Sequence, residues 1–175
     1  MSRLWLLLIG VLGSCAARPA PAPPSSSRSS SPASASVSDS SARSAEVAAA
    51  LRGFLDAFEN LAWEPFRASF ADDACVFFPS ARTPERFCGR DAVEARFREV
   101  FDGERRAATS GPPYLHLQPE ELQIQLVGDA AAIASFHLRN QQRTARRSFV
   151  FRRDGASWRI VHLHASNVPW PDEAH

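Results

Sequence analysis

The chain lacks lysine, a large net charge and any apolar run long enough to span a bilayer. All 20 basic residues are arginine. Alanine is also abundant, a bias typical of GC-rich genomes, and we give the missing lysines no functional weight. The formal net charge is only +1, which excludes a global field that would attract nucleic acid or an anionic membrane. An electrostatic partner would therefore have to be bound locally.

The length and the apolar content predict one domain. The chain has 175 residues, and 45% of them are apolar. This allows one globular domain with a substantial core, and we do not expect a second domain.

The first 15 residues have the pattern of a secretory signal peptide. Arg3 supplies the positive charge, and residues 4–12 form an apolar segment that is too short for a transmembrane helix. Leu-Gly-Ser-Cys at residues 12–15 resembles the lipobox of bacterial lipoproteins, which implies that Cys15 is lipidated and becomes the mature N-terminus. The alternative is ordinary signal cleavage one or two residues further on.

Residues 16–44 are predicted to form a disordered tether. They contain twelve Ser, seven Ala and five Pro, and almost no side chain that burial would stabilise. A flexible tether after a lipidated cysteine would hold a domain at a membrane surface. Ala16 after the cysteine resembles lipoproteins that are sent to an outer membrane. We therefore expect an exported, membrane-anchored lipoprotein of the bacterial cell envelope, at the outer membrane if the host is diderm.

Two further cysteines lie on either side of a proline-containing turn. If Cys15 is lipidated, Cys75 and Cys88 remain as an even pair in an oxidising compartment. They predict either a disulfide across a hairpin or two buried thiols, and the sequence leaves both open.

Helical periodicity begins near residue 45. The apolar positions of a first amphipathic helix are Val47, Leu51, Phe54, Leu55, Phe58 and Ala62. Glu64 and Pro65 suit the start of a short second helix. Asp91 and Glu94 form an N-cap and N3 pair that opens a third helix.

The rest of the chain favours strands. The predicted strands span residues 75–78, 114–118, 121–127, 130–139, 144–153 and 157–166. Turn signals separate the last four strands, for example Gly128 with Asp129 and Asp154 with Gly155. A chain that begins with helices and ends in an antiparallel meander predicts an α+β fold.

Four segments resemble the SnoaL-like superfamily, which is also known as nuclear-transport-factor-2-like. They are "FADDACVFFP", "CGRDAVEARF", "PPYLHL" and "WRIVHLHASNVPW", and they occur in the family's order within residues 45–169. The resemblance implies a cone-shaped, strongly curved mixed or antiparallel sheet packed on three N-terminal helices, with a hydrophobic pocket in its concave face. It also implies a homodimer that pairs through the outer face of the sheet. Residues 170–175 would be a C-terminal tail.

Ketosteroid isomerases are enzyme relatives within this resemblance, and they use an aspartate base with a tyrosine and a protonated aspartate. Alignment on "FADDA" and on the hairpin at Gly155 places the base on Phe78, the tyrosine on Phe54 and the second aspartate on Phe149. None of the three groups is kept, so we do not expect ketosteroid isomerase activity.

Strand alternation predicts which side chains face the pocket. On the last strand Trp158, Ile160, His162, His164 and Ser166 share one face, and the resemblance places that face inward. His162 and His164 are therefore candidates for general acid and base catalysis, or for orienting a ligand through hydrogen bonds. The same alternation turns His137 outward, so we expect neither a third zinc ligand nor a metal site. We expect no other cofactor.

Residues 139–153 hold six arginines and no acid. We interpret them as a solvated hairpin that pairs with acidic helices, and we expect no nucleic-acid binding because no aromatic platform accompanies them. Arg147 differs, because it shares a face with Phe149 and Phe151 and would hold an anionic ligand group at the pocket.

The candidate ligand-binding residues are Phe54, Phe58, Trp63, Phe78, Tyr114, Phe136, Arg147, Phe149, His162 and His164. Three hypotheses follow for the function. The domain binds a small, largely apolar molecule, either neutral or anionic; or it is an isomerase, cyclase or hydrolase that uses the histidines; or it is a dimerising accessory protein of the cell envelope. The fold alone does not separate them.

Overall fold

The protein has the α+β fold that the sequence predicts. The computed structural model describes residues 32–79, 84–139 and 143–169. The elements are α1 (Pro32–Glu59), α2 (Trp63–Ala68), β1 (Phe70–Phe77), β2 (Arg86–Cys88), α3 (Arg90–Ala107), β3 (Glu120–Val127), β4 (Ala131–Arg139), β5 (Arg143–Asp154) and β6 (Ser157–Pro169). The predicted signal peptide with Cys15, the first part of the predicted tether and the C-terminal tail lie outside the described residues. Within the described ranges, no helix is long and apolar enough to cross a bilayer.

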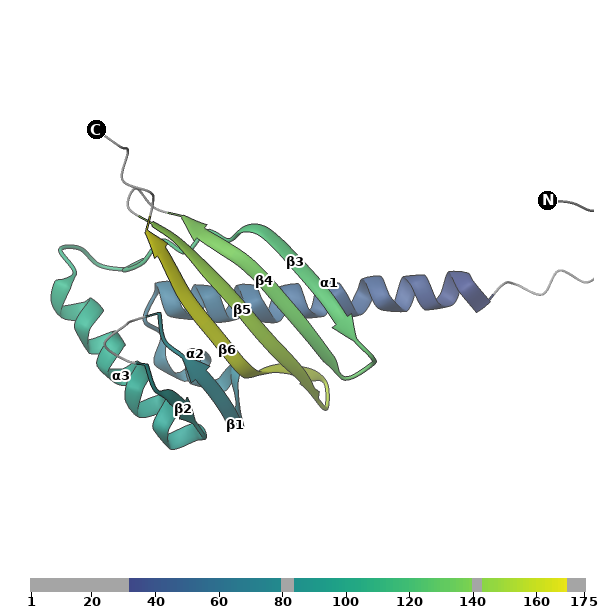
Figure 1. Ribbon diagram of the computed structural model, residues 1–175, viewed down its shortest axis with the longest axis horizontal. Helices are drawn as coiled ribbons and strands as arrows, with labels where there is room; N and C mark the ends of the chain where they lie inside the picture. The colour runs from purple at the N-terminus through teal and green to yellow at the C-terminus, as the bar shows by residue number, and fades with distance from the viewer. Residues whose placement is uncertain (1–31, 80–83, 140–142, 170–175) are drawn as a thin grey trace, which may run out of the picture. The chain divides into compact units, whose positions relative to one another are not determined.

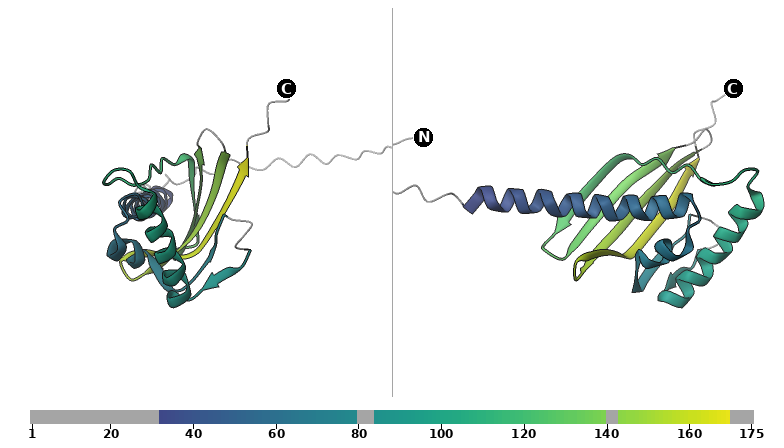
Figure 2. Two further views of the ribbon diagram at one scale, coloured as in Figure 1. Left: turned by 90° about the vertical axis from the view of Figure 1, so that its left-hand side faces the viewer. Right: turned by 180° about the vertical axis from the view of Figure 1, so that it is seen from behind.

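The strands form one open, mixed sheet in the order β2-β1-β6-β5-β4-β3. Neighbouring strands are antiparallel, except that β1 and β6 are parallel. Figure 1 shows α1 crossing one face of the sheet, and Figure 2 shows the strands curving around the side that carries the helices. The tight turns of the meander use Gly128 and Gly155, whose φ angles of 63° and 60° suit a residue without a side chain.

Helix α1 begins earlier than the sequence predicts. Its inward positions are buried as expected, from Val47 to Phe54 and Leu55. However, the helix starts at Pro32, so residues 32–44 are helical and not disordered as the sequence predicts. Proline suits the first helical position and alanine favours a helix. The Arg43 guanidinium also donates to the Asp129 carboxylate at 2.6 Å, which holds this turn against the β3–β4 hairpin.

Residues 114–118 were predicted as a strand, and that prediction is wrong. The backbone N–H groups of Tyr114 and Leu115 donate to the Glu59 carbonyl at 2.8 and 3.2 Å, and the N–H of Leu117 donates to the Glu59 carboxylate. The end of α1 therefore takes the hydrogen bonds that a neighbouring strand would have taken. Conversely, the short strand β2 was not predicted, because three residues carry no measurable alternation.

Helix α3 begins one residue before the predicted cap. Gly89 is the N-cap residue and makes no side-chain capping hydrogen bond, and Asp91 lies inside the first turn. There its negative charge is favourable beside the exposed N–H groups of the helix end. The predicted cap is thus wrong by position, although the helix itself is confirmed.

The core lies between the helices and the concave face of the sheet. Phe66 of α2 is 1% exposed, and its ring centroid lies 4.8 Å from those of Phe97 and Phe101.

One irregularity in the sheet determines which side chains of β6 face the helices. Phe151 of β5 pairs with Ile160 of β6, whereas the preceding Val150 pairs with His162, so Val161 is an extra residue in β6. Such a bulge shifts every later side chain of the strand to the opposite face.

Candidate functional site

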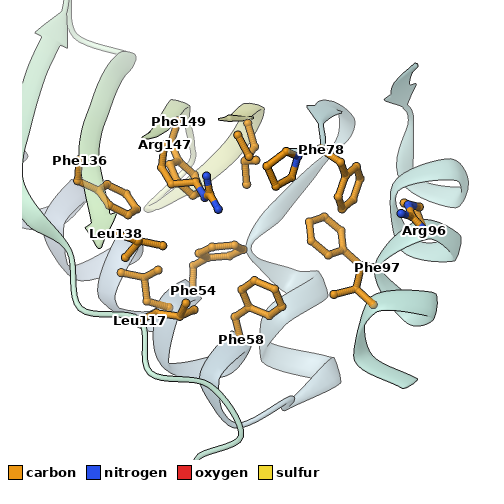
Figure 3. Close-up of a pocket in the computed structure, with 15 residues that line it drawn as sticks. Phe54, Phe58, Phe78, Arg96, Phe97, Leu117, Phe136, Leu138, Arg147 and Phe149 are labelled. Carbon is orange, nitrogen blue, oxygen red and sulfur yellow. The ribbon is translucent and has the colours of Figure 1, made fainter. Parts of the chain in front are cut away.

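A cavity of about 280 Å³ lies between α1, α3 and the concave face of β4, β5 and β6. Its walls are mostly phenylalanine and other apolar side chains, with two arginines. The lining residues are Phe54, Leu55, Phe58, Phe78, Pro79, Arg96, Phe97, Val100, Leu117, Phe136, Leu138, Arg147, Phe149, Leu163 and Ala165. Figure 3 shows these side chains surrounding the cavity from both the helices and the strands. The arrangement is that of a small-molecule pocket, since few polar groups interrupt an apolar wall.

Aromatic contacts fix the floor of the cavity. Phe54 of α1 meets Phe149 of β5 edge to face, with ring centroids 5.3 Å apart, and Phe149 stacks on Phe136 of β4 at 5.6 Å. Phe54 and Phe149 are 2% and 1% exposed. Interlocked rings of this kind have little freedom to move. The floor is therefore a preformed apolar surface.

Arg147 carries positive charge into the cavity. The alternation of β5 places Arg147, Phe149 and Phe151 on one face, as predicted, and Figure 3 shows the guanidinium directed at the space above Phe54. Its Nη1 group donates to the backbone carbonyls of Arg146 and Ser166, at 2.8 and 3.1 Å. These two carbonyls help to hold the guanidinium in place, and Arg147 contributes a positively charged group to the lining.

The second lining arginine lies at the edge of the cavity. The Arg96 guanidinium sits 5.1 Å from the centre of the Phe78 ring and donates to the Glu99 carboxylate at 2.5 Å. Phe78 and Phe97 stand between it and the centre in Figure 3. Sequence patterns did not indicate Arg96, because it lies on a helix with many charged residues.

His162 and His164 do not line the cavity, and their predicted inward orientation is wrong. Because Val161 is an extra residue, Leu163 and Ala165 take the inward positions and are 6% and 7% exposed. The two imidazoles lie on the outer face of the sheet, where their ring centroids are 6.0 and 5.5 Å from that of Phe77. Strand parity failed at the bulge, although it was correct for Trp158 and Ile160, which are both buried.

His137, which the sequence analysis considered as a third zinc ligand, also lies on the outer face of the sheet. The Nδ1 atom of His137 lies 3.2 Å from the Glu121 carboxylate, on the face predicted for it. Burial lowers the pKa of His162, and the nearby charges of His164 and Arg86 lower it further. Among the described residues, no three metal-ligating side chains come together.

The other predicted ligand-binding residues divide into two groups. Phe54, Phe58, Phe78, Phe136, Arg147 and Phe149 line the cavity. Trp63 and Tyr114 do not: the Trp63 ring packs edge to face on Phe101, with the Arg98 guanidinium 4.0 Å from its centre. Both side chains are half-buried and pack against the hydrophobic core, and their spacing could not distinguish core from cavity wall.

A disulfide closes the hairpin that forms one wall. Cys75 of β1 is bonded to Cys88 of β2, directly opposite in the strand register. Between the two cysteines along the chain lie Phe78 and Pro79, which both line the cavity. Of the two alternatives that the sequence left open, the structure has the disulfide.

The positions aligned with the ketosteroid isomerase groups are three phenylalanines of the cavity wall. Phe54, Phe78 and Phe149 occupy the places of the tyrosine, the base and the second aspartate. More generally, none of the described lining residues has a carboxyl, imidazole, phenol or thiol group. The lining thus offers cations and hydrogen-bond donors but no general base.

Comparisons with known proteins agree with this architecture. The sequence profile of the SnoaL-like domain matches residues 47–171. A comparison with curated proteins gives no match. Among solved structures, an NTF2-like protein of unknown function from Pseudomonas putida is 20% identical, with a TM-score of 0.60 over 76% of this chain and 91% of that chain.

Two more structural neighbours carry more specific names. A proposed dehydratase of the NTF2-like family from Streptomyces avermitilis is 18% identical, with a TM-score of 0.60 over 74% of this chain and 98% of that chain. The CamKII hub homology domain of Chlamydomonas reinhardtii is 22% identical, with a TM-score of 0.54 over 71% of this chain and 97% of that chain. At these identities the likeness shows a shared fold.

Proposed function

The chain belongs to the SnoaL-like family, and on that premise we propose that its domain binds a small, largely apolar molecule in the cavity lined by α1, α3 and the sheet. The observation that carries this proposal is a preformed apolar cavity of about 280 Å³ whose charged groups are both arginines. An apolar pocket with a few fixed polar groups is the usual form of a ligand site.

The lining favours binding over catalysis. General acid and base chemistry needs a titratable group within hydrogen-bond reach of the substrate. The described lining residues include no such group apart from the arginines, which stay protonated. His162 and His164, on which the enzyme hypothesis depended, lie on the other face of the sheet. One structural neighbour is named a dehydratase, but the described residues that line this cavity include no acid or base that would catalyse a dehydration.

The cellular setting is part of the proposal. The signal-like residues 1–15 and the lipobox at Cys15 support export and anchoring to a membrane of the bacterial cell envelope. In a bacterial host grown with radiolabelled palmitate, the unmodified protein should incorporate the label and the Cys15→Ala protein should not. Equal labelling of the two proteins, or labelling of neither, would contradict lipid anchoring at Cys15.

We also include a homodimer formed through the outer face of the sheet. Within the described residues that face is not covered by any helix (Figure 2) and carries half-buried apolar side chains, among them Phe77, Ile133 and Val150. One structural neighbour is named a hub homology domain, which is consistent with assembly on this scaffold.

A cavity-filling substitution tests the binding proposal. Ala165→Leu places an isobutyl group in the cavity, because Ala165 is buried on its wall. Binding of the small, neutral fluorescent probe 1-naphthylamine is titrated with the full chain. We expect saturable binding by the unmodified protein and at least about a fivefold weaker affinity in A165L, since crowding of the added side chain against the bound probe costs on the order of 1–3 kcal/mol.

His164→Asn is the matched control. His164 is the neighbour of Ala165 on the same strand and points to the opposite face. We expect H164N to bind the probe as the unmodified protein does. An unaltered affinity in A165L, or an equal loss in H164N, would overturn the assignment of the cavity as the binding site.

A further inference from the structure

The size of the cavity limits its ligand. An engineered apolar cavity of about 150 Å³ takes up benzene, so a cavity of about 280 Å³ has room for one or two fused rings. Pockets for drug-sized molecules begin at about 300 Å³ and extend far beyond. A four-ring steroid nucleus therefore exceeds what these walls enclose.

The walls favour a flat, aromatic body. Six of the lining side chains are phenylalanines, namely Phe54, Phe58, Phe78, Phe97, Phe136 and Phe149. Aromatic pairs gain stability beyond the area that they bury when rings meet edge to face or in offset stacks. The rings that already meet in the floor, Phe54 with Phe149 and Phe149 with Phe136, show that both geometries fit here.

The positive charge in the cavity lining indicates which polar group the ligand carries. Arg147 pairs across the sheet with Phe136 on one side and Ala165 on the other, so its guanidinium emerges between two wall residues. Arg147 is itself half-buried, as are Leu138 and Leu117 in the same lining, so this part of the wall reaches solvent. A guanidinium binds carboxylate through a planar fork of N–H donors. No described lining residue carries a negative charge that would repel an anion.

We propose that the cavity binds a compact aromatic carboxylate of one or two rings, with the ring against Phe54 and Phe149 and the carboxylate at Arg147. This assignment rests on the proposed function and specifies its ligand class. The aromatic body occupies the dry floor, and the anionic group stays at the arginine near the solvent side. Desolvation of the ring and charge-assisted hydrogen bonds then act at opposite ends of one small molecule.

The test compares matched ligands on the full chain by isothermal titration calorimetry. The ligands are 1-naphthoate, the neutral 1-naphthalenemethanol and the steroid carboxylate cholate. We expect 1-naphthoate to bind at least about tenfold more tightly than 1-naphthalenemethanol, since hydrogen bonds to a charged group are the stronger ones. Cholate should bind much more weakly than 1-naphthoate.

Three arginine variants test whether Arg147 binds the carboxylate. Arg147→Met keeps an apolar stem and removes the guanidinium, and it should weaken 1-naphthoate by about tenfold or more while leaving 1-naphthalenemethanol unchanged. Arg146→Met is the control, because Arg146 is the adjacent residue of β5 and is exposed on the opposite face. Arg147→Lys keeps the charge without the planar fork, and its affinity for 1-naphthoate should lie between those of R146M and R147M. This variant keeps the test valid if R147M is unstable.

The outcomes separate the two proposals. Equal affinity for 1-naphthoate and 1-naphthalenemethanol, or equal losses in R146M and R147M, overturns the carboxylate assignment and leaves the binding function intact. Tight binding of cholate in the cavity overturns the size limit in the same way. Failure of 1-naphthoate, 1-naphthalenemethanol and 1-naphthylamine to bind overturns the ligand class and the proposed function together.

Discussion

At the residue scale, Phe66 is the centre of the aromatic core. Its ring lies 5.2 Å from that of Phe54 and 4.8 Å from those of Phe97 and Phe101, so it joins all three helices. Phe66→Ala should lower the free energy of unfolding by about 3–5 kcal/mol, because it removes buried ring contacts and leaves a cavity. Denaturant unfolding followed by circular dichroism measures the loss.

Val127→Ala serves as the control for that measurement. Val127 is 53% exposed at the end of β3, so its truncation should change the free energy of unfolding by less than about 0.5 kcal/mol. Similar losses in both variants would show that Phe66 does not have the central position described above.

His162 makes a second prediction at the residue scale. Burial, then His164 and Arg86, lower the pKa of His162 below its ordinary value of 6.5. The unfolded chain therefore binds more protons than the folded chain when the pH drops to and below 6.5. Stability from this group is complete above that pH and is lost as the pH falls, so the melting temperature should decrease from pH 7 to pH 5.

His162→Gln should reduce that decrease in melting temperature, because glutamine does not titrate. His116→Gln is the matched control, since His116 is exposed on the segment before β3. A pH profile for H162Q that coincides with that of the unmodified protein would exclude His162 as the origin of the effect.

At the element scale, the disulfide between β1 and β2 stabilises the hairpin wall. The two cysteines are 13 residues apart in sequence, and closing a loop of that size contributes about 3 kcal/mol in the chain-entropy account. The double variant Cys75→Ala/Cys88→Ala should lose about that much unfolding free energy. Adding dithiothreitol to the unmodified protein should give a similar loss and leave the double variant unaffected. No effect of the reductant would contradict a disulfide in the folded protein.

Sequence patterns located most elements but missed those that depend on distant partners. The buried stripe from Val47 to Phe54 and the hairpin turns at Gly128 and Gly155 are visible from periodicity and turn chemistry. The early start of α1 was missed because the first turns of the helix are held by a hydrogen bond from Arg43 to Asp129, a residue far along the chain. The segment at residues 114–118 was misassigned because Glu59 accepts its N–H groups.

At the scale of the whole molecule, the proposed homodimer depends on the outer face of the sheet. Ile133→Asp puts a charge beside Val150, its partner in the strand register. It should raise the dimer dissociation constant by at least about tenfold, since a buried charge without a partner is costly. Sedimentation velocity measures the change, and binding of 1-naphthylamine should be retained.

Val37→Asp is the matched control for dimerisation. Val37 is 67% exposed on α1 and does not belong to the sheet. A monomeric unmodified protein, or equal dissociation by both variants, would remove the outer face as the dimer interface.

The sequence by itself determined the α+β class, the family resemblance and the aromatic composition of the wall, because these follow from residue type and short-range periodicity. It also placed Arg147 correctly, since β5 alternates without interruption on that side. Only the tertiary structure decided which face His162 and His164 occupy. The extra residue, Val161, is an apolar residue beside the apolar Ile160, so no feature of the pattern marks it. A bulge is set by how β6 fits between β1 and β5 in a curved sheet, and that fit exists only once the strands are assembled.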